Sequence, residues 1–115
     1  MTDKIQITTV MRRFTEGVKF YQPSKLETQT LNEKFITSGK ILSRESYVAS
    51  DKMSKTIITH FASQQALDEF NADPTQMKII QDRNNWCIEN NMRVSLMIQT
   101  YNDAGITSTE NRVIL

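Results

Sequence analysis

The stretch from Lys55 to Thr75, KTIITHFASQQALDEFNADPT, constrains the fold of this chain most strongly. It begins with a β-branched run, which favours an extended strand, and continues after Ser63 with apolar residues at helical spacing. Asp73-Pro74 then interrupts the helical pattern, because proline lacks a backbone N–H and is best accommodated in the first turn of a new helix. We therefore expect a strand that leads directly into a short helix, and a second helix that begins at Pro74.

Strand and helix patterns alternate along the rest of the chain. Ser24 and Glu27 are spaced as a capping box, which predicts the start of a helix, and Gly39 suits the left-handed residue just past its end. Residues 18–21 resume extended character after Gly17, as a bulged continuation of the first strand or as a small hairpin. The expected strands cover residues 4–14, 41–49, 53–61 and 92–98, and the expected helices cover 25–38, 64–70 and 74–90.

The order of these elements predicts the fold class. Residues 41–49 and 53–61 are joined by so short a link that they must be antiparallel neighbours. The order β-α-β-β-α-β predicts an α+β, ferredoxin-like domain: a four-stranded antiparallel sheet with two helices on one face. We expect one domain over residues 1–103 and a C-terminal tail over 104–115, where the sequence has no strong pattern. Alternation from Met92 to Ile98 leaves open which of its two faces meets the helices.

Composition limits the kind of protein this can be. The chain has 115 residues, a formal net charge of +1 from 14 basic and 13 acidic residues, and 38% apolar residues. Interspersed charges do not indicate nucleic-acid binding, and no run approaches the roughly 20 apolar residues that span a bilayer. With an acidic residue at position 3, no apolar stretch typical of a signal peptide, and a single cysteine, the chain is expected to be cytoplasmic. Low apolar content favours a core completed by a second copy.

The segment from Thr59 to Trp86, THFASQQALDEFNADPTQMKIIQDRNNW, resembles dimeric α+β barrel proteins of the antibiotic-biosynthesis monooxygenase type. The features that carry the resemblance are Ser63 after the strand, the Ala66 and Phe70 pattern, and the break at Asp73-Pro74. It implies a homodimer through the sheet face and a pocket between each sheet and its helices that holds a small organic ligand. It also implies cofactor-free oxygenation as one activity of such proteins, so no cofactor is expected.

His60 is the candidate catalytic residue. It is the only histidine, so a site with several histidine ligands is excluded and no metal site is expected. An imidazole near neutral pH can act as a general acid or base. The alternative is a polar residue on one face of the sheet.

The candidate ligand-binding residues are aromatic side chains and one arginine. Tyr47 and Tyr101 could orient a phenol or a quinone, Trp86 and Phe61 could form an apolar wall, and Arg93, like Arg44, could reach an anionic ligand. The alternatives are packing for the aromatic residues and solvent exposure for the arginines.

Two hypotheses for function remain open at this point. The first is a monooxygenase-like enzyme or binder of a small organic ligand, with a pocket lined by His60, Trp86, Tyr47 and Phe61. The second is a non-enzymatic module for dimerisation or interaction. An enclosed cavity would favour the first hypothesis and a filled core the second. The sequence alone does not decide whether the protein is an enzyme.

Overall fold

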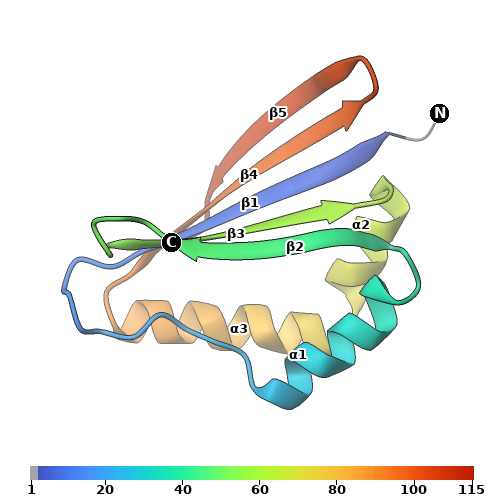
Figure 1. The fold of residues 1–115 in the computed structure, drawn as a ribbon. Helices are drawn as coiled ribbons and strands as arrows, with labels where there is room; N and C mark the ends of the chain where they lie inside the picture. The colour runs from blue at the N-terminus through green and yellow to red at the C-terminus, as the bar shows by residue number, and fades with distance from the viewer. Residues whose placement is uncertain (1–2) are drawn as a thin grey trace.

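The computed structural model describes residues 3–115 as an antiparallel sheet covered on one side by helices (Figure 1). Their order follows the expected alternation, with one additional strand at the C-terminal end. The elements are β1 (Lys4–Arg12), α1 (Lys25–Leu31), the π-helical segment η1 (Asn32–Ile36), β2 (Ile41–Val48), β3 (Ser54–Phe61), α2 (Gln64–Ala72), α3 (Pro74–Glu89), β4 (Arg93–Asn102) and β5 (Gly105–Val113).

The sheet has five strands in the order β2-β3-β1-β4-β5, so the prediction of four strands is wrong. The first four follow the ferredoxin-like arrangement, and β5 adds an edge strand that pairs antiparallel with β4. Every residue of β5 is exposed, so no apolar alternation marks this strand in the sequence. It forms because its backbone satisfies the free edge of β4, which residue patterning does not reveal.

The segment after β1 forms neither the predicted bulged strand nor a hairpin. β1 is paired with β3 along one edge and with β4 along the other, so no edge remains for residues 18–21. The segment is held by side chains: the Arg13 guanidinium donates to the carbonyl oxygens of Lys52 at 2.8 Å and Val18 at 2.7 Å. The indole N–H of Trp86 donates to the Lys19 carbonyl at 2.9 Å, which fixes the same loop to α3.

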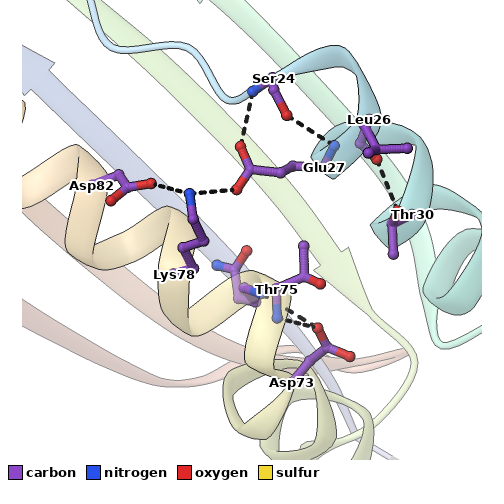
Figure 2. Close-up of polar contacts among 9 residues, drawn as sticks. Ser24, Leu26, Glu27, Thr30, Asp73, Thr75, Lys78 and Asp82 are labelled. Carbon is purple, nitrogen blue, oxygen red and sulfur yellow. Dashed lines mark hydrogen bonds and ion pairs between the residues drawn. The ribbon is translucent and has the colours of Figure 1, made fainter.

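The predicted capping box at the first helix is confirmed. The Glu27 N–H donates to Ser24 Oγ, and the Ser24 N–H donates to Glu27 Oε1, both at 3.1 Å (Figure 2). The Lys78 ammonium joins this box to α3, because it lies 3.3 Å from Glu27 Oε2 and 2.6 Å from Asp82 Oδ2. The helical region begins where predicted and ends in η1 and a turn before Gly39, which has the expected positive φ of 79°.

The predicted break between α2 and α3 is also confirmed. Asp73 ends α2 and caps α3: its N–H donates to the Phe70 carbonyl at 3.2 Å, and its carboxylate accepts the N–H groups of Thr75 and Gln76 at 2.9 and 3.3 Å. Gln76, three residues after Asp73, does not complete a capping box, because the Asp73 N–H is already bonded to the Phe70 carbonyl. Among residues 3–115 no helix is long and apolar enough to cross a membrane.

Strand register decides which side chains meet the helices. In β1, Ile7 pairs with Thr59 of β3 and with Ile98 of β4, and these side chains share the helix-facing side with the other odd-numbered residues of β1. Val94, Leu96 and Ile98 therefore face the helices, which resolves the alternative left open by the sequence. No helix of residues 3–115 covers the opposite face of the sheet (Figure 1).

The buried apolar residues form two clusters instead of one. The first surrounds Phe61 and Phe70, whose ring centroids lie 5.2 Å apart, and it includes Ile79 of α3. The second contains Met11, Cys87, Met92 and Val94, with Trp86 packed against it. Most small domains have one contiguous core. Here the apolar side chains are divided between two clusters, and there is space between them.

Candidate functional site

A cavity of about 560 Å³ lies between the sheet and the helices. Its floor is formed by helix-facing side chains of the three central strands, among them Ile7, Phe61 and Leu96, and its walls are formed by α2 and α3. Residues of both apolar clusters line it, which places the cavity in the gap between them. Its volume lies within the range of roughly 300–1,000 Å³ that is typical of small-ligand sites.

Two arginines in the cavity lining lack an anionic partner. Arg83 of α3 donates Nε and Nη2 to Asn84 Oδ1 at 3.2 and 3.0 Å, and burial lowers its pKa. Arg44 of the edge strand β2 is exposed, and nearby protein atoms lower its pKa in the same direction. Within residues 3–115 neither arginine forms an ion pair.

Gln76 of α3 contributes a buried polar atom to the same lining. Its side chain is 8% exposed, and its Oε1 makes no hydrogen bond to any residue in the described range 3–115. Most buried polar atoms in folded proteins are hydrogen-bonded, so an unpaired amide in a cavity wall indicates a place for a polar group of a ligand or for water. Gln76, Ile79, Ile80 and Arg83 share one stripe of α3 that faces this cavity.

The structure separates the residues that the sequence grouped as a site. Phe61 lines the cavity, but His60, the next residue back along β3, is on the uncovered face of the sheet. There His60 Nδ1 and the Tyr101 hydroxyl lie 2.9 Å apart and share a hydrogen bond, and the two rings are nearly perpendicular. Tyr47, 55% exposed, is on the same face as His60, because it pairs with Thr56.

The remaining predicted residues also lie outside the cavity lining. Trp86 packs against the Met11 cluster and anchors the loop through Lys19. Arg93 is exposed on the uncovered face, opposite Arg12. Arg44 was among the residues that the sequence suggested for an anionic ligand, whereas Arg83 and Gln76 were not predicted as site residues. The seven-residue spacing of the latter two, with Ile79 and Ile80 between them, is the signal that could have placed them on one helix face.

No metal site is evident in the described part of the chain, since residues 3–115 contain no group of three or more His, Cys, Asp or Glu side chains placed to hold an ion. The cavity is therefore best described by what its own side chains offer: an apolar floor and wall, three arginines, two carboxylates and one unpaired amide. This combination suits an organic molecule with an apolar body and polar substituents.

Comparisons with known proteins match this chain through its fold. No protein-family model matches the sequence, and no curated protein matches it significantly. A solved structure of a conserved protein of unknown function from Bacteroides thetaiotaomicron, described as a candidate oxidoreductase, superposes with a TM-score of 0.64 at 8% identity. The match covers 88% of this chain and 100% of that chain.

Two further structures are similar. The Mycobacterium tuberculosis protein Rv0793 superposes with a TM-score of 0.57 at 16% identity, over 89% of this chain and 97% of that one. A candidate antibiotic biosynthesis monooxygenase from Deinococcus radiodurans matches at 12% identity over 90% and 96% of the two chains, with a TM-score of 0.49, too low to support the fold by itself. The first two of these structures show that the chain shares their fold over most of its length, as the expected resemblance requires.

Proposed function

We propose that this protein binds a small organic molecule in the cavity between the sheet and the helices, and that it is a monooxygenase-like enzyme. The observation that carries the proposal is the cavity of about 560 Å³ that separates the two apolar clusters. A filled core would have favoured a non-enzymatic interaction module. The similar fold of a candidate oxidoreductase supports the reaction class by analogy.

Cofactor-free oxygenation of an electron-rich phenol is the chemistry that we propose for this cavity. The phenol and dioxygen yield a quinone and water, so the ring supplies the electrons and one oxygen atom is incorporated. Such a reaction requires the protein to orient the ring and to stabilise its phenolate. Arg44 and Arg83 are placed for that electrostatic role, and the apolar floor around Phe61 and Leu96 for the orienting role.

His60 does not line the cavity, and its catalytic role stays a prediction. The hydrogen bond between His60 and Tyr101 lies on the uncovered sheet face, where we propose that a second copy of the chain packs. A homodimer through this face would bury the His60–Tyr101 pair and the partly apolar surface around Ile58 and Met97. The rate of phenol oxygenation by His60→Ala, compared with that of the unaltered protein, tests the catalytic prediction.

The test of ligand binding uses N-phenyl-1-naphthylamine, a neutral aromatic probe whose fluorescence rises in apolar surroundings. We expect saturable binding to the unaltered protein. Leu96→Trp should lower the affinity at least about tenfold, because the larger ring fills the cavity from its floor. Ile80→Phe, on the α3 wall, is a second filled variant for use if Leu96→Trp does not fold.

The matched control is Ile88→Trp, a similar enlargement on α3 outside the cavity lining, where the isoleucine is 65% exposed. It should leave the affinity within about twofold, since the side chain lies outside the cavity. Circular dichroism verifies that each variant is folded. Probe binding that is equal in folded Leu96→Trp, Ile80→Phe and unaltered protein would overturn the proposed site.

A further inference from the structure

We propose that the natural ligand of this cavity is an organic anion, with an apolar body and a carboxylate, sulfonate or phenolate group bound between Arg44 and Arg83. This inference rests on the proposed function and specifies the chemical class of its ligand. The argument depends on three features of the cavity: its balance of charges, the two arginines in its lining that have no anionic partner, and the unpaired amide of Gln76.

The charges that line the cavity do not cancel. Three arginines and two carboxylates line it, and one arginine is neutralised locally: Arg112 donates Nε and Nη2 to the two oxygens of Glu110 at 3.1 and 3.0 Å. Asp68 accepts a hydrogen bond from Gln64 at 2.9 Å and forms no ion pair within residues 3–115. Arg44 and Arg83 are therefore left as the cations available to a ligand.

The position of these two cations in the cavity lining makes them suitable sites for an anion. Arg83 is partly buried and Arg44 is exposed at the rim of the edge strand, and nearby protein atoms lower the pKa of each guanidinium. A guanidinium stays protonated even so, and it presents a planar set of donors that matches a carboxylate or sulfonate. An anion that enters the cavity would accept from these donors in surroundings of low polarity, where a charge-assisted hydrogen bond is strong.

Gln76 indicates a second polar group on the ligand. Its amide is freed by local geometry, because the Asp73 N–H that a capping box would supply is bonded to the Phe70 carbonyl. Seven residues separate Gln76 from Arg83, which corresponds to about 10 Å along α3. A ligand that contacts both would therefore carry its anionic group near Arg83 and a hydrogen-bonding group up to about 10 Å away. Either a donor or an acceptor fits, since the amide can flip.

The test compares two probes that differ by one charge. 8-Anilinonaphthalene-1-sulfonate is N-phenyl-1-naphthylamine with an added sulfonate, so both share the same apolar body. We expect the double variant Arg44→Gln/Arg83→Gln to lower the affinity for the sulfonate at least about tenfold and to leave that for the neutral probe within about twofold. The matched control is Arg12→Gln, which removes one exposed cation from the uncovered face of the same sheet and should change neither affinity.

The outcomes separate this inference from the proposed function. If the neutral probe binds in the cavity and the double variant weakens both probes equally or neither, the anion preference is overturned and the cavity site stands. If neither probe binds the unaltered protein, the cavity site itself is overturned. Single variants at Arg44 and Arg83 repeat the measurement if the double variant does not fold.

Gln76→Met supplies a measurement that needs no probe. Because the Gln76 Oε1 makes no hydrogen bond within residues 3–115, its removal should leave the melting temperature of the ligand-free protein unchanged or raise it. A fall of more than about 4 °C would show that the amide has a structural role and would overturn its assignment to the ligand.

Discussion

At the scale of single residues, Asp73 joins three helical segments: it ends α2, caps α3 and binds Lys34 of η1. Its carboxylate, 5% exposed, caps α3 and accepts a hydrogen bond from the Lys34 ammonium at 2.7 Å. Burial alone would raise the pKa of Asp73, but the hydrogen bonds from Lys34 and from the Gln76 and Thr75 N–H groups outweigh it and lower the pKa. The ionised form is therefore the one that stabilises the fold.

We expect Asp73→Asn to reduce the acid sensitivity of the protein. A lowered pKa in the folded state means that the contribution of Asp73 is complete above its ordinary pKa of about 3.9 and is lost as pH falls through the folded value. Asparagine keeps the cap but has no charge to lose, so the variant should lose less stability between pH about 5 and pH about 2.5 than the unaltered protein. Urea unfolding at both pH values measures the difference.

The control for this prediction is Asp103→Asn. Asp103 is exposed in the turn between β4 and β5, so its replacement should leave the pH dependence of stability unchanged. Equal acid sensitivity in Asp73→Asn and the unaltered protein would contradict the role assigned to the Asp73 carboxylate.

At the scale of secondary-structure elements, β5 extends the sheet and also delivers apolar side chains to the core. Ile114 and Leu115 follow β5, and the N–H group of each donates to the Val94 carbonyl, at 2.9 and 3.2 Å. Both side chains pack against the Met11 cluster, and Ile114 also lines the cavity. An exposed strand thus positions a partly buried anchor just past its end.

We expect Ile114→Ala to destabilise the protein by about 1–2 kcal/mol, less than the loss of a fully buried isoleucine, because the side chain is partly buried. Ile88→Ala, at an exposed position of α3, should cost less than about 0.5 kcal/mol. Urea denaturation of the two variants provides the comparison. Similar losses of stability at the two positions would show that the end of β5 is not anchored in the core.

At the scale of the whole molecule, the two faces of one sheet serve different purposes. The helix-facing side carries the cavity, whereas the other side carries the His60–Tyr101 pair and is uncovered within the described residues (Figure 1). Thr8 lies at the middle of that uncovered face, paired with Ile58 on one neighbouring strand and Met97 on the other. A sheet face with this mixture of apolar and aromatic side chains suits a second copy of the same surface.

We expect the unaltered protein to have the mass of a dimer by light scattering and Thr8→Arg to have the mass of a monomer. Two copies related by two-fold symmetry would bring the two introduced charges together at a buried surface, which is strongly unfavourable. Gln81→Arg, on the exposed side of α3, adds the same charge elsewhere and should remain a dimer. A monomeric unaltered protein, or a dimeric Thr8→Arg, would contradict the proposed interface.

Signals that act over one helical turn were sufficient to predict the local features of this chain. The capping box at Ser24, the start of a helix after Ser63 and the break at Asp73-Pro74 are confirmed, because each depends on neighbours three or four residues away. Alternation of side chains along β3 likewise accounts for the position of His60 and Ile57 on opposite faces of the sheet.

The sequence by itself therefore determined the order of the elements from β1 to β4, most of their ends and the sets of side chains that share a face. Only the tertiary structure decided which face the helices cover, and hence that Phe61, Arg44 and Arg83 line a cavity while His60 does not. It also decided that β5 pairs with β4 and that Gln76 is left unpaired. The physical reason is that both outcomes depend on partners outside the local pattern. A strand pairs with whichever backbone edge is free, and two acceptors compete for one N–H group. The spacing of residues along the chain does not show which partner wins.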